Sequence, residues 1–317
     1  MAPLSIVVEC VSKRYGAVQA LDGISFTVQE GTVLGLLGPS RSGKTTMIRL
    51  LATLLAHDSG RILVDGLDIY RDARMLRTRL GLAGQFVSLV PQLTGYENLV
   101  MAGRLCGLGR HRSRSRAAEL VDQFDLSEVA DRRLDRCSCL VRCKFGLAAA
   151  LVHEPRVLLL DEPALGLDAA TRMRLWDAVG NRVLGGRTVL LATQCLEEAD
   201  LLARRITVID CGQVVAEGTG DEVKALTGGV CLEAELRNDG DLAAAQAVLS
   251  PIADAPLVTD LRTLRIRTPT ARGAELLSEA VRILSQNGVQ VREIGLRLPT
   301  LGDVLQAVGQ RAVADRK

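Results

Sequence analysis

The hydrophobic and polar positions change their period several times along the chain. Residues 5–30 alternate apolar and polar side chains, the period-two pattern of strands whose two faces differ. Gly16, Gly23 and Gly31 predict turns between these strands. The next stretch, TVLGLLGPSRSGKTTMIRLLATLL, predicts a buried strand, a glycine-containing loop and a helix. We therefore expect a β-rich layer followed by one strand–loop–helix unit.

The middle of the chain mixes the helical and strand patterns. Residues 97–130 place apolar side chains at three- and four-residue steps, which predicts helices. From residue 145 onward, helical segments alternate with short apolar strands such as RVLLLD and RTVLLAT. Strands that alternate with helices are typical of a mostly parallel sheet. This part of the chain is therefore expected to have an α/β fold.

The last part of the chain has a different pattern. It changes around Thr227–Gly229, and residues 230–317 show the order βαββαβ followed by a last helix. This order predicts a small α+β domain. A length of 317 residues agrees with about two domains. We therefore divide the chain into a main domain, residues 1–229, and an accessory domain, residues 230–317.

Composition narrows the class of protein. Hydrophobic residues make up 48% of the chain, enough for a large core, and 39 basic against 37 acidic residues give a net charge of +2. This balance does not favour a nucleic-acid partner. No apolar run approaches the roughly 18 residues that a membrane helix needs, and the start lacks the pattern of a secretion signal. We expect a cytosolic protein that reaches a membrane only through a partner.

Two local clusters have simple interpretations. Cys137, Cys139 and Cys143 lack the paired C-x2-C spacing of metal sites, so they are expected to be reduced thiols with small, buried side chains. The basic run from Arg110 to Arg116 has the charge to contact phosphates or lipid headgroups. Such runs are more often solvated helix starts, and we favour that interpretation.

The segment GPSRSGKT, from Gly38 to Thr45, matches the phosphate-loop pattern G-x4-G-K-[ST]. It follows an expected strand and begins an expected helix, the context that the pattern requires. Backbone N–H groups of such a loop point at phosphate oxygens, the lysine adds positive charge at the β and γ phosphates, and the hydroxyl of Thr45 ligates Mg²⁺. The sequence therefore predicts binding of ATP. The expected contact residues are Gly38, Pro39, Ser40, Arg41, Ser42, Gly43, Lys44, Thr45 and Thr46.

A second motif, RVLLLDEP, is an apolar strand that ends in two acidic residues. Asp161 is expected to hold Mg²⁺, usually through water, and Glu162 to polarise the attacking water as a general base. Two acids after a strand are common by themselves, and a solvated turn is the alternative interpretation. Together with the phosphate loop, they predict a site that hydrolyses ATP.

These motifs carry a family resemblance. The chain resembles the ATP-binding subunit of an ABC transporter, and is most similar to the daunorubicin/doxorubicin-resistance type of drug exporter ATPase. The resemblance covers nearly the whole chain and implies a P-loop NTPase fold with an antiparallel β subdomain and a helical subdomain, followed by the small α+β domain. The segments that carry it are YGAVQALDGISF, LLGPSRSGKTTMIRLLATLL, GQFVSLVPQLTGYENL, AAALVHEPRVLLLDEPALGLD, LLATQCLEEADLLARRITVIDCGQVVAEGT and RLPTLGDVLQAV.

The resemblance implies roles for further residues. Tyr15 would stack on the adenine, and Gln85 would contact Mg²⁺ and the γ phosphate and couple to a membrane partner. In this family two subunits sandwich two ATP molecules. Asp168 would lie at the seam between the subunits, and Ser138 would belong to the signature motif that caps the ATP of the other subunit.

The signature motif departs from the family pattern. CSCLV keeps Ser138 but has Cys139 and Leu140 where the family has two glycines. Glycine suits a close approach of the backbone to a phosphate, and a leucine side chain brings bulk to a place where an anion should lie. The cap on ATP is therefore expected to be weakened.

Three further positions differ from the family. Arg41 replaces the usual glycine of the phosphate loop, and Ala164 replaces a Ser or Thr near the dimer seam. Gln194 stands where many relatives have a catalytic histidine that senses the γ phosphate, although the drug-exporter subgroup often has glutamine there. Because the phosphate loop and both acids are intact, we expect ATP binding to be retained and hydrolysis to be slow or partner-dependent.

The resemblance therefore implies the ATP-binding subunit of an exporter of a drug, lipid or other hydrophobic compound. Its cofactors would be ATP and Mg²⁺, and its partners a separate membrane permease and a second ATP-binding subunit, in a homodimer or a heterodimer. It would lie at the cytoplasmic face of the membrane, with no nucleic-acid partner. The alternative is a nucleotide-binding regulatory or assembly subunit with little hydrolysis. A soluble ABC-type ATPase acting on ribosomes or DNA is disfavoured by the balanced charge and the single ATPase module.

Overall fold

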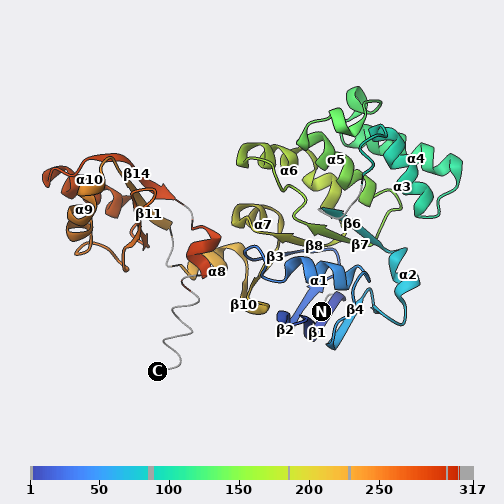
Figure 1. The fold of residues 1–317 in the computed structure, drawn as a ribbon, viewed down its shortest axis with the longest axis horizontal. Helices are drawn as coiled ribbons and strands as arrows, with labels where there is room; N and C mark the ends of the chain where they lie inside the picture. Colours follow the sequence, from blue (N-terminus) through green and yellow to red (C-terminus); the bar gives the residue numbers. More distant parts are fainter. Residues whose placement is uncertain are drawn as a thin grey trace. The chain divides into compact units, whose positions relative to one another are not determined.

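The computed structural model describes residues 3–84, 89–184, 186–227, 230–297, 299–305 and 307, with the side chains of residues 178–184 outside the description. The chain divides into two compact units, Met1–Thr219 and Gly220–Lys317, which are described separately (Figure 1). Residues 228 and 229, where the sequence pattern changes, lie outside the described part. The predicted domain boundary at residue 229 therefore stays a prediction.

The strands of the first unit form two sheets. Their bounds are β1 (Leu4–Tyr15), β2 (Val18–Gln29), β3 (Val33–Leu37), β4 (Ser59–Val64), β5 (Leu67–Asp68), β6 (Leu80–Gly84), β7 (Val157–Asp161), β8 (Thr188–Thr193), β9 (Arg205–Asp210) and β10 (Gln213–Gly218). An antiparallel sheet has the order β2-β1-β4-β5. The larger sheet has the order β10-β9-β3-β8-β7-β6 and is parallel except for β10.

The helices of the first unit cover both faces of the larger sheet. Their bounds are α1 (Lys44–Leu51), α2 (Ala73–Arg77), α3 (Gly95–Leu105), α4 (Arg110–Gln123), η1 (Ser127–Val129), η2 (Leu134–Arg136), α5 (Cys139–Ala150), α6 (Ala169–Leu184) and α7 (Leu196–Leu202). Helix α1 packs between the two sheets, where Met47 and Leu51 share a core with strands of both. Helices α3, α4 and α5 form a helical subdomain around the buried Phe145 and Phe124 (Figure 1).

Burial explains why these sequences form these strands. Every residue of β7 and β8 is buried, as expected for central strands of a parallel sheet that is covered on both faces. In β2, by contrast, the half toward Gln29 alternates buried and exposed residues, because only one face of this antiparallel strand packs on the core. The predicted α/β fold with its antiparallel and helical subdomains is confirmed.

The turn predicted at Gly23 is wrong. Gly23 lies within β2 with φ +64°, and the pairing of β1 with β2 shifts register between Val11↔Ile24 and Lys13↔Leu21. A β-bulge needs the same positive φ that a tight turn needs, and glycine adopts it without strain. The glycine signal therefore marks an irregularity of the strand, whereas the turn predicted at Gly16 is confirmed.

The second unit has its own sheet and core. Its elements are α8 (Gly220–Ala225), β11 (Val230–Leu236), η3 (Asp239–Asp241), α9 (Leu242–Leu249), β12 (Val258–Asp260), β13 (Arg265–Thr270), α10 (Ala274–Gln286) and β14 (Val291–Arg297). The sheet is antiparallel with the order β12-β13-β11-β14. Leu249 of α9 and Leu276 of α10 are buried in one cluster with Leu232 of β11. The predicted order βαββαβ is confirmed, and residues 301–305 are helical.

In the described part of the chain, no helix combines the length and apolar character needed to cross a lipid bilayer.

Candidate functional site

The loop between β3 and α1 has a backbone path that its glycines make possible. Gly43 precedes α1 with φ +110°, and a Cβ atom there would lie 2.6 Å from the carbonyl oxygen of Ala20. At Gly38 a Cβ atom would lie 2.3 Å from the carbonyl oxygen of Ile209. Arg41 is exposed and has φ +67°, a conformation that glycine adopts more easily. The loop therefore wraps tightly over the carboxyl ends of the central strands, where parallel sheets bind ligands.

Lys44, the first residue of α1, is 3% exposed. Its Nζ donates hydrogen bonds of 2.8 Å to the carbonyl oxygens of Gly38 and Pro39, and lies 3.4 Å from Oε1 of Glu162. Burial lowers the pKa of Lys44, while the charges of Glu162 and Asp161 oppose this effect. The lysine thus places an ammonium group inside the loop, between its carbonyls and a carboxylate.

Asp161 ends β7 and lies beside Thr45. Oγ1 of Thr45 donates a hydrogen bond of 3.1 Å to Oδ1 of Asp161. Oδ2 of Asp161 is buried and has no hydrogen-bond partner among the described residues. Burial raises the pKa of Asp161, and the bond from Thr45 partly opposes it. A hydroxyl beside a carboxylate with a free oxygen is a donor set that suits Mg²⁺, which prefers oxygen ligands.

Glu162 and Gln194 connect the ends of two neighbouring strands. Nε2 of Gln194 donates to both carboxylate oxygens of Glu162, at 2.8 and 2.9 Å. Oε1 of Gln194 accepts a hydrogen bond of 3.1 Å from the hydroxyl of Ser40 in the phosphate loop. Gln194 therefore connects the phosphate loop with Glu162, and its two hydrogen bonds orient the carboxylate of Glu162.

Gln85, predicted as a catalytic and Mg²⁺-contacting residue, lies outside the described residues. Its neighbour Gly84 ends β6 directly beside Asp161, and a Cβ atom at Gly84 would lie 2.0 Å from the carbonyl oxygen of Asp161. Gly84, the last described residue before Gln85, therefore lies next to Asp161. The role of Gln85 stays a prediction.

The start of α5 contains the predicted signature residues. Ser138 precedes the helix, and its Oγ accepts a hydrogen bond of 3.3 Å from the N–H of Val141. Cys139 and Leu140 form the first turn of the helix and are partly exposed. Cys139 and Glu162 line the same hollow of about 390 Å³, but no hydrogen bond within the described residues joins Ser138 to the phosphate loop.

The described contacts of Tyr15 and Asp168 are made with residues near them in the sequence. Tyr15 ends β1 and is 42% exposed, and Nζ of Lys13 lies over its ring, 5.8 Å from the centroid. Asp168 precedes α6, is exposed, and accepts hydrogen bonds from the N–H and the hydroxyl of Thr171 at 2.9 and 2.7 Å. These bonds lower the pKa of Asp168. Ala164 is 2% exposed and packs in the core that contains the helical subdomain.

Side-chain contacts thus bring the phosphate loop together with Asp161, Glu162 and Gln194. The contacts of Tyr15, Ser138 and Asp168 described above are all with residues outside the loop. Glu198 is not among the residues predicted from the sequence. It is a buried carboxyl group that borders a hollow of about 400 Å³ together with Glu162 and Gln194. The available signal was weak, because an acidic residue in LEEADLL is typical of a solvated helix face.

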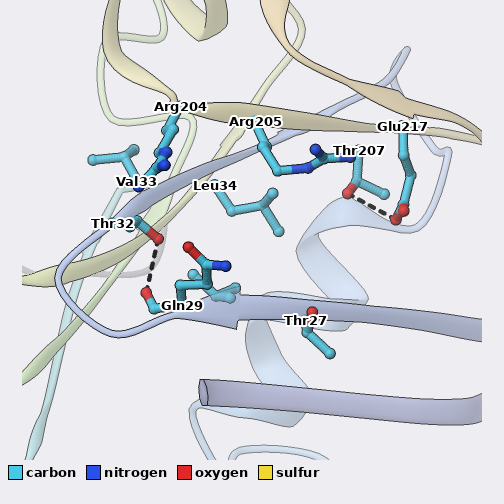
Figure 2. Close-up of a pocket in the computed structure, with 10 residues that line it drawn as sticks. Thr27, Gln29, Thr32, Val33, Leu34, Arg204, Arg205, Thr207 and Glu217 are labelled. Carbon is cyan, nitrogen blue, oxygen red and sulfur yellow. Dashed lines mark hydrogen bonds between the residues drawn. The ribbon is translucent and has the colours of Figure 1, made fainter. Parts of the chain in front are cut away.

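Another hollow lies at the opposite, amino ends of β3 and β9, as Figure 2 shows. It has a volume of about 270 Å³ and includes Arg205, while Thr207 Oγ1 donates to Glu217 at 3.1 Å and Thr32 Oγ1 donates to the carbonyl of Gln29 at 2.7 Å. Its described lining contains none of the residues predicted for the site. The candidate site is therefore the one at the carboxyl ends of the strands.

Comparisons with known proteins agree with this geometry. Residues 21–165 match the family described as ABC transporter. The chain is 47% identical to the daunorubicin resistance ATP-binding protein DrrA3 of Streptomyces coeruleorubidus over 304 residues, 96% of this chain and 95% of that protein. It is 41% identical to the daunorubicin/doxorubicin resistance ATP-binding protein DrrA of Streptomyces peucetius, over 96% of this chain and 92% of that protein. A solved ATP-binding subunit of an ABC transporter superposes with a TM-score of 0.61 at 26% identity, over 70% of this chain and 93% of that chain.

Proposed function

Because this chain belongs to the family of ABC transporter ATP-binding proteins, among its daunorubicin and doxorubicin resistance members, we propose that it is the ATP-binding subunit of an exporter. The chain is an ABC-type ATPase. In our proposal, the binding and hydrolysis of ATP drive the efflux of a drug, lipid or other hydrophobic compound through a separate membrane permease. The permease holds the subunit at the cytoplasmic face of the membrane.

One observation carries the proposal: the phosphate loop, the two acids and Gln194 form one connected cluster. Lys44, Thr45 and Gln194 each contact Asp161 or Glu162 within 3.4 Å. In ABC-type chemistry these groups surround the β and γ phosphates. The side chains proposed to bind the phosphates therefore contact those proposed to activate water.

The roles follow from the donors and acceptors present. Lys44 binds phosphate oxygens with N–H groups that now donate to the carbonyls of Gly38 and Pro39. Thr45 and the free oxygen of Asp161 would hold Mg²⁺, and the ion would neutralise charge on the phosphates. Glu162 accepts a proton from the attacking water, and Gln194 keeps its carboxylate oriented. Tyr15 stacks on the adenine with its exposed ring.

A second candidate function is a nucleotide-holding regulatory or assembly subunit. It is favoured by Cys139 and Leu140, which occupy the first turn of α5 where the family has glycines. In a homodimer, both ATP sites would have this weakened cap. In a heterodimer, a partner with an intact motif would cap the ATP on this chain.

The test compares the purified chain with the Glu162→Gln variant in ATP binding by calorimetry and in steady-state ATP hydrolysis. We expect both proteins to bind Mg-ATP with similar affinity, and turnover to fall at least about 100-fold in the variant because the general base is lost. Glu154→Gln changes an exposed carboxylate that pairs with Arg112, and serves as the matched control.

Each other outcome has a defined meaning. A parent protein that does not bind ATP would overturn the proposal. Binding without turnover would favour the second candidate, and equal turnover in parent and variant would remove Glu162 from its role.

A further inference from the structure

Glu198 is a buried carboxyl group near the ATP-binding cluster, by which we mean the phosphate loop with Asp161, Glu162 and Gln194. It lies in α7 and is 2% exposed. A buried carboxyl group destabilises the fold unless hydrogen bonds compensate for its lost hydration. Two donors from separate elements do so: Nε1 of Trp176 in α6 donates to Oε1 at 2.7 Å, and the hydroxyl of Thr193 at the end of β8 donates to Oε2.

Through Thr193, Glu198 fixes the turn that carries Gln194. Oγ1 of Thr193 accepts a hydrogen bond of 3.0 Å from the N–H of Cys195, and the carbonyl of Thr193 accepts one of 3.2 Å from the N–H of Gly38. The residues on both sides of Gln194 are thus held in place. Gln194 itself extends to Glu162 and Ser40.

Through Trp176, Glu198 connects the same turn to α6, the helix that follows Asp168. A second contact also joins α6 to this turn, because Arg172 of α6 donates to Sγ of Cys195 at 3.1 Å. Arg172 donates in addition to the carbonyl of Leu167 at 3.2 Å. A movement of the turn that carries Gln194, or a movement of α6, would therefore change the hydrogen bonds of Glu198.

We propose that Glu198 is a positioning residue for ATP hydrolysis: through Thr193 it holds Gln194 against Glu162, and through Trp176 it links occupancy of the ATP site to α6. This inference rests on the proposed function. It goes beyond the phosphate loop and the two acids, because Glu198 contacts neither the phosphate loop nor the acidic pair by a hydrogen bond among the described residues. The burial that raises the pKa of Glu198 also restricts its side chain to this position.

The sequence supplies its own reporter, since Trp176 is the one tryptophan of the chain. Mg-ATP is added to the Glu162→Gln variant, in which turnover is blocked, and tryptophan emission is recorded while calorimetry measures binding. We expect the emission to change with the same midpoint as binding. With Glu198→Gln added, we expect ATP to bind within about 3-fold of the original affinity and the emission change to be lost.

Kinetics provide the second measurement. In the otherwise unchanged protein, Glu198→Gln and Thr193→Val should each lower kcat about 10-fold or more with little change in KM, as is typical when a residue that orients a catalytic group is removed. Thr193→Ser retains the hydroxyl and should restore kcat. The reduction should not add to that of Gln194→Ala, because both changes act through the same side chain.

The matched control is Glu154→Gln, which neutralises an exposed carboxyl group that pairs with Arg112 and should change neither emission nor kcat. Should Glu198→Gln fail to fold, Trp176→Phe removes only the indole donor and leaves the kinetic test available. ATP binding without an emission change in the Glu162→Gln parent, or additive effects of Glu198→Gln and Gln194→Ala, would overturn the positioning role alone. Absence of ATP binding by calorimetry would overturn the proposed function and, with it, this inference.

Discussion

At the scale of single residues, the first turn of α5 is the sharpest difference from the family pattern. Cys139 and Leu140 adopt regular helical geometry there, and Ser138 uses its oxygen to cap the helix. The turn itself is regular, and the N–H of Val141 is donated to Ser138. We therefore propose that the side chains of Cys139 and Leu140 weaken the cap on ATP through their bulk, and not through a distorted backbone.

Replacing both side chains, Cys139→Gly with Leu140→Gly, should raise steady-state ATP turnover at least about 10-fold, since transition-state donors of this kind contribute ~10²–10³ each. The same change should lower the free energy of unfolding by about 1–2 kcal/mol, because glycine is a poor helix former. ATPase assays and urea unfolding measure the two effects. Ala118→Gly on the exposed face of α4 is the control for helix weakening alone. Unchanged turnover would remove the steric explanation.

Glu198 also gives a pH-dependent contribution to stability. Burial raises its pKa above the ordinary value of 4.5, so the folded state binds this proton more tightly than the unfolded state does. The contribution of Glu198 to the free energy of unfolding is therefore fully present below the ordinary pKa and is lost as pH rises through the raised pKa. Glu198→Gln cannot titrate, so the stability of the variant relative to the parent should increase with pH. Urea unfolding from pH 4 to pH 8 measures this, and a constant difference would contradict it.

The site residues that the sequence predicted are those with a fixed local pattern, such as the phosphate loop and the two acids after β7. Glu198 and Trp176 could not be found in this way. They are 22 positions apart and meet only because α6 and α7 pack beside the end of β8. Their pairing depends on tertiary structure, and a single sequence contains no local signal for it.

At the scale of elements, the contact between α3 and α5 depends on one glycine. A Cβ atom at Gly95 would lie 2.0 Å from Cζ and within 2.5 Å of both Cε atoms of Phe145, whose ring is fully buried. The helical subdomain therefore packs α3 against α5 at a distance that excludes even an alanine.

Gly95→Ala should lower the free energy of unfolding by about 1–3 kcal/mol through overpacking. Gly146→Ala in α5 is the matched control, because a Cβ atom there meets no atom within 4 Å. It should instead raise stability by about 0.5–1 kcal/mol, since alanine favours a helix over glycine. Urea unfolding of both variants tests the pair, and equal effects would contradict the packing argument.

The order of strands and helices could be predicted because burial on one or both faces produces a clear periodic pattern of apolar residues. This pattern did not reveal the β-bulge at Gly23. A register shift between two paired strands is a property of the pair, and the pattern of either strand alone does not contain it.

At the scale of the whole molecule, the two units have separate cores. The buried clusters of the first unit contain residues between Ile6 and Ile209, and the cluster of the second unit contains residues between Leu232 and Val289. The ATP-binding cluster lies entirely within the first unit.

A fragment of residues 1–219 should therefore fold and bind Mg-ATP within about 3-fold of the affinity of the full chain, since its core and its site are complete. Circular dichroism and calorimetry of the fragment beside the full chain test this. A fragment that unfolds, or binds more than about 10-fold more weakly, would show that the second unit supports the site.

The backbone at Arg41 has a consequence for substitution at this position. With φ +67°, the chain passes through this residue in the conformation that glycine adopts freely. Glycine is also the residue that the family resemblance leads us to expect there. Arg41→Gly would therefore meet a backbone that already fits it, and we expect the loop to accept it without compensating substitutions elsewhere.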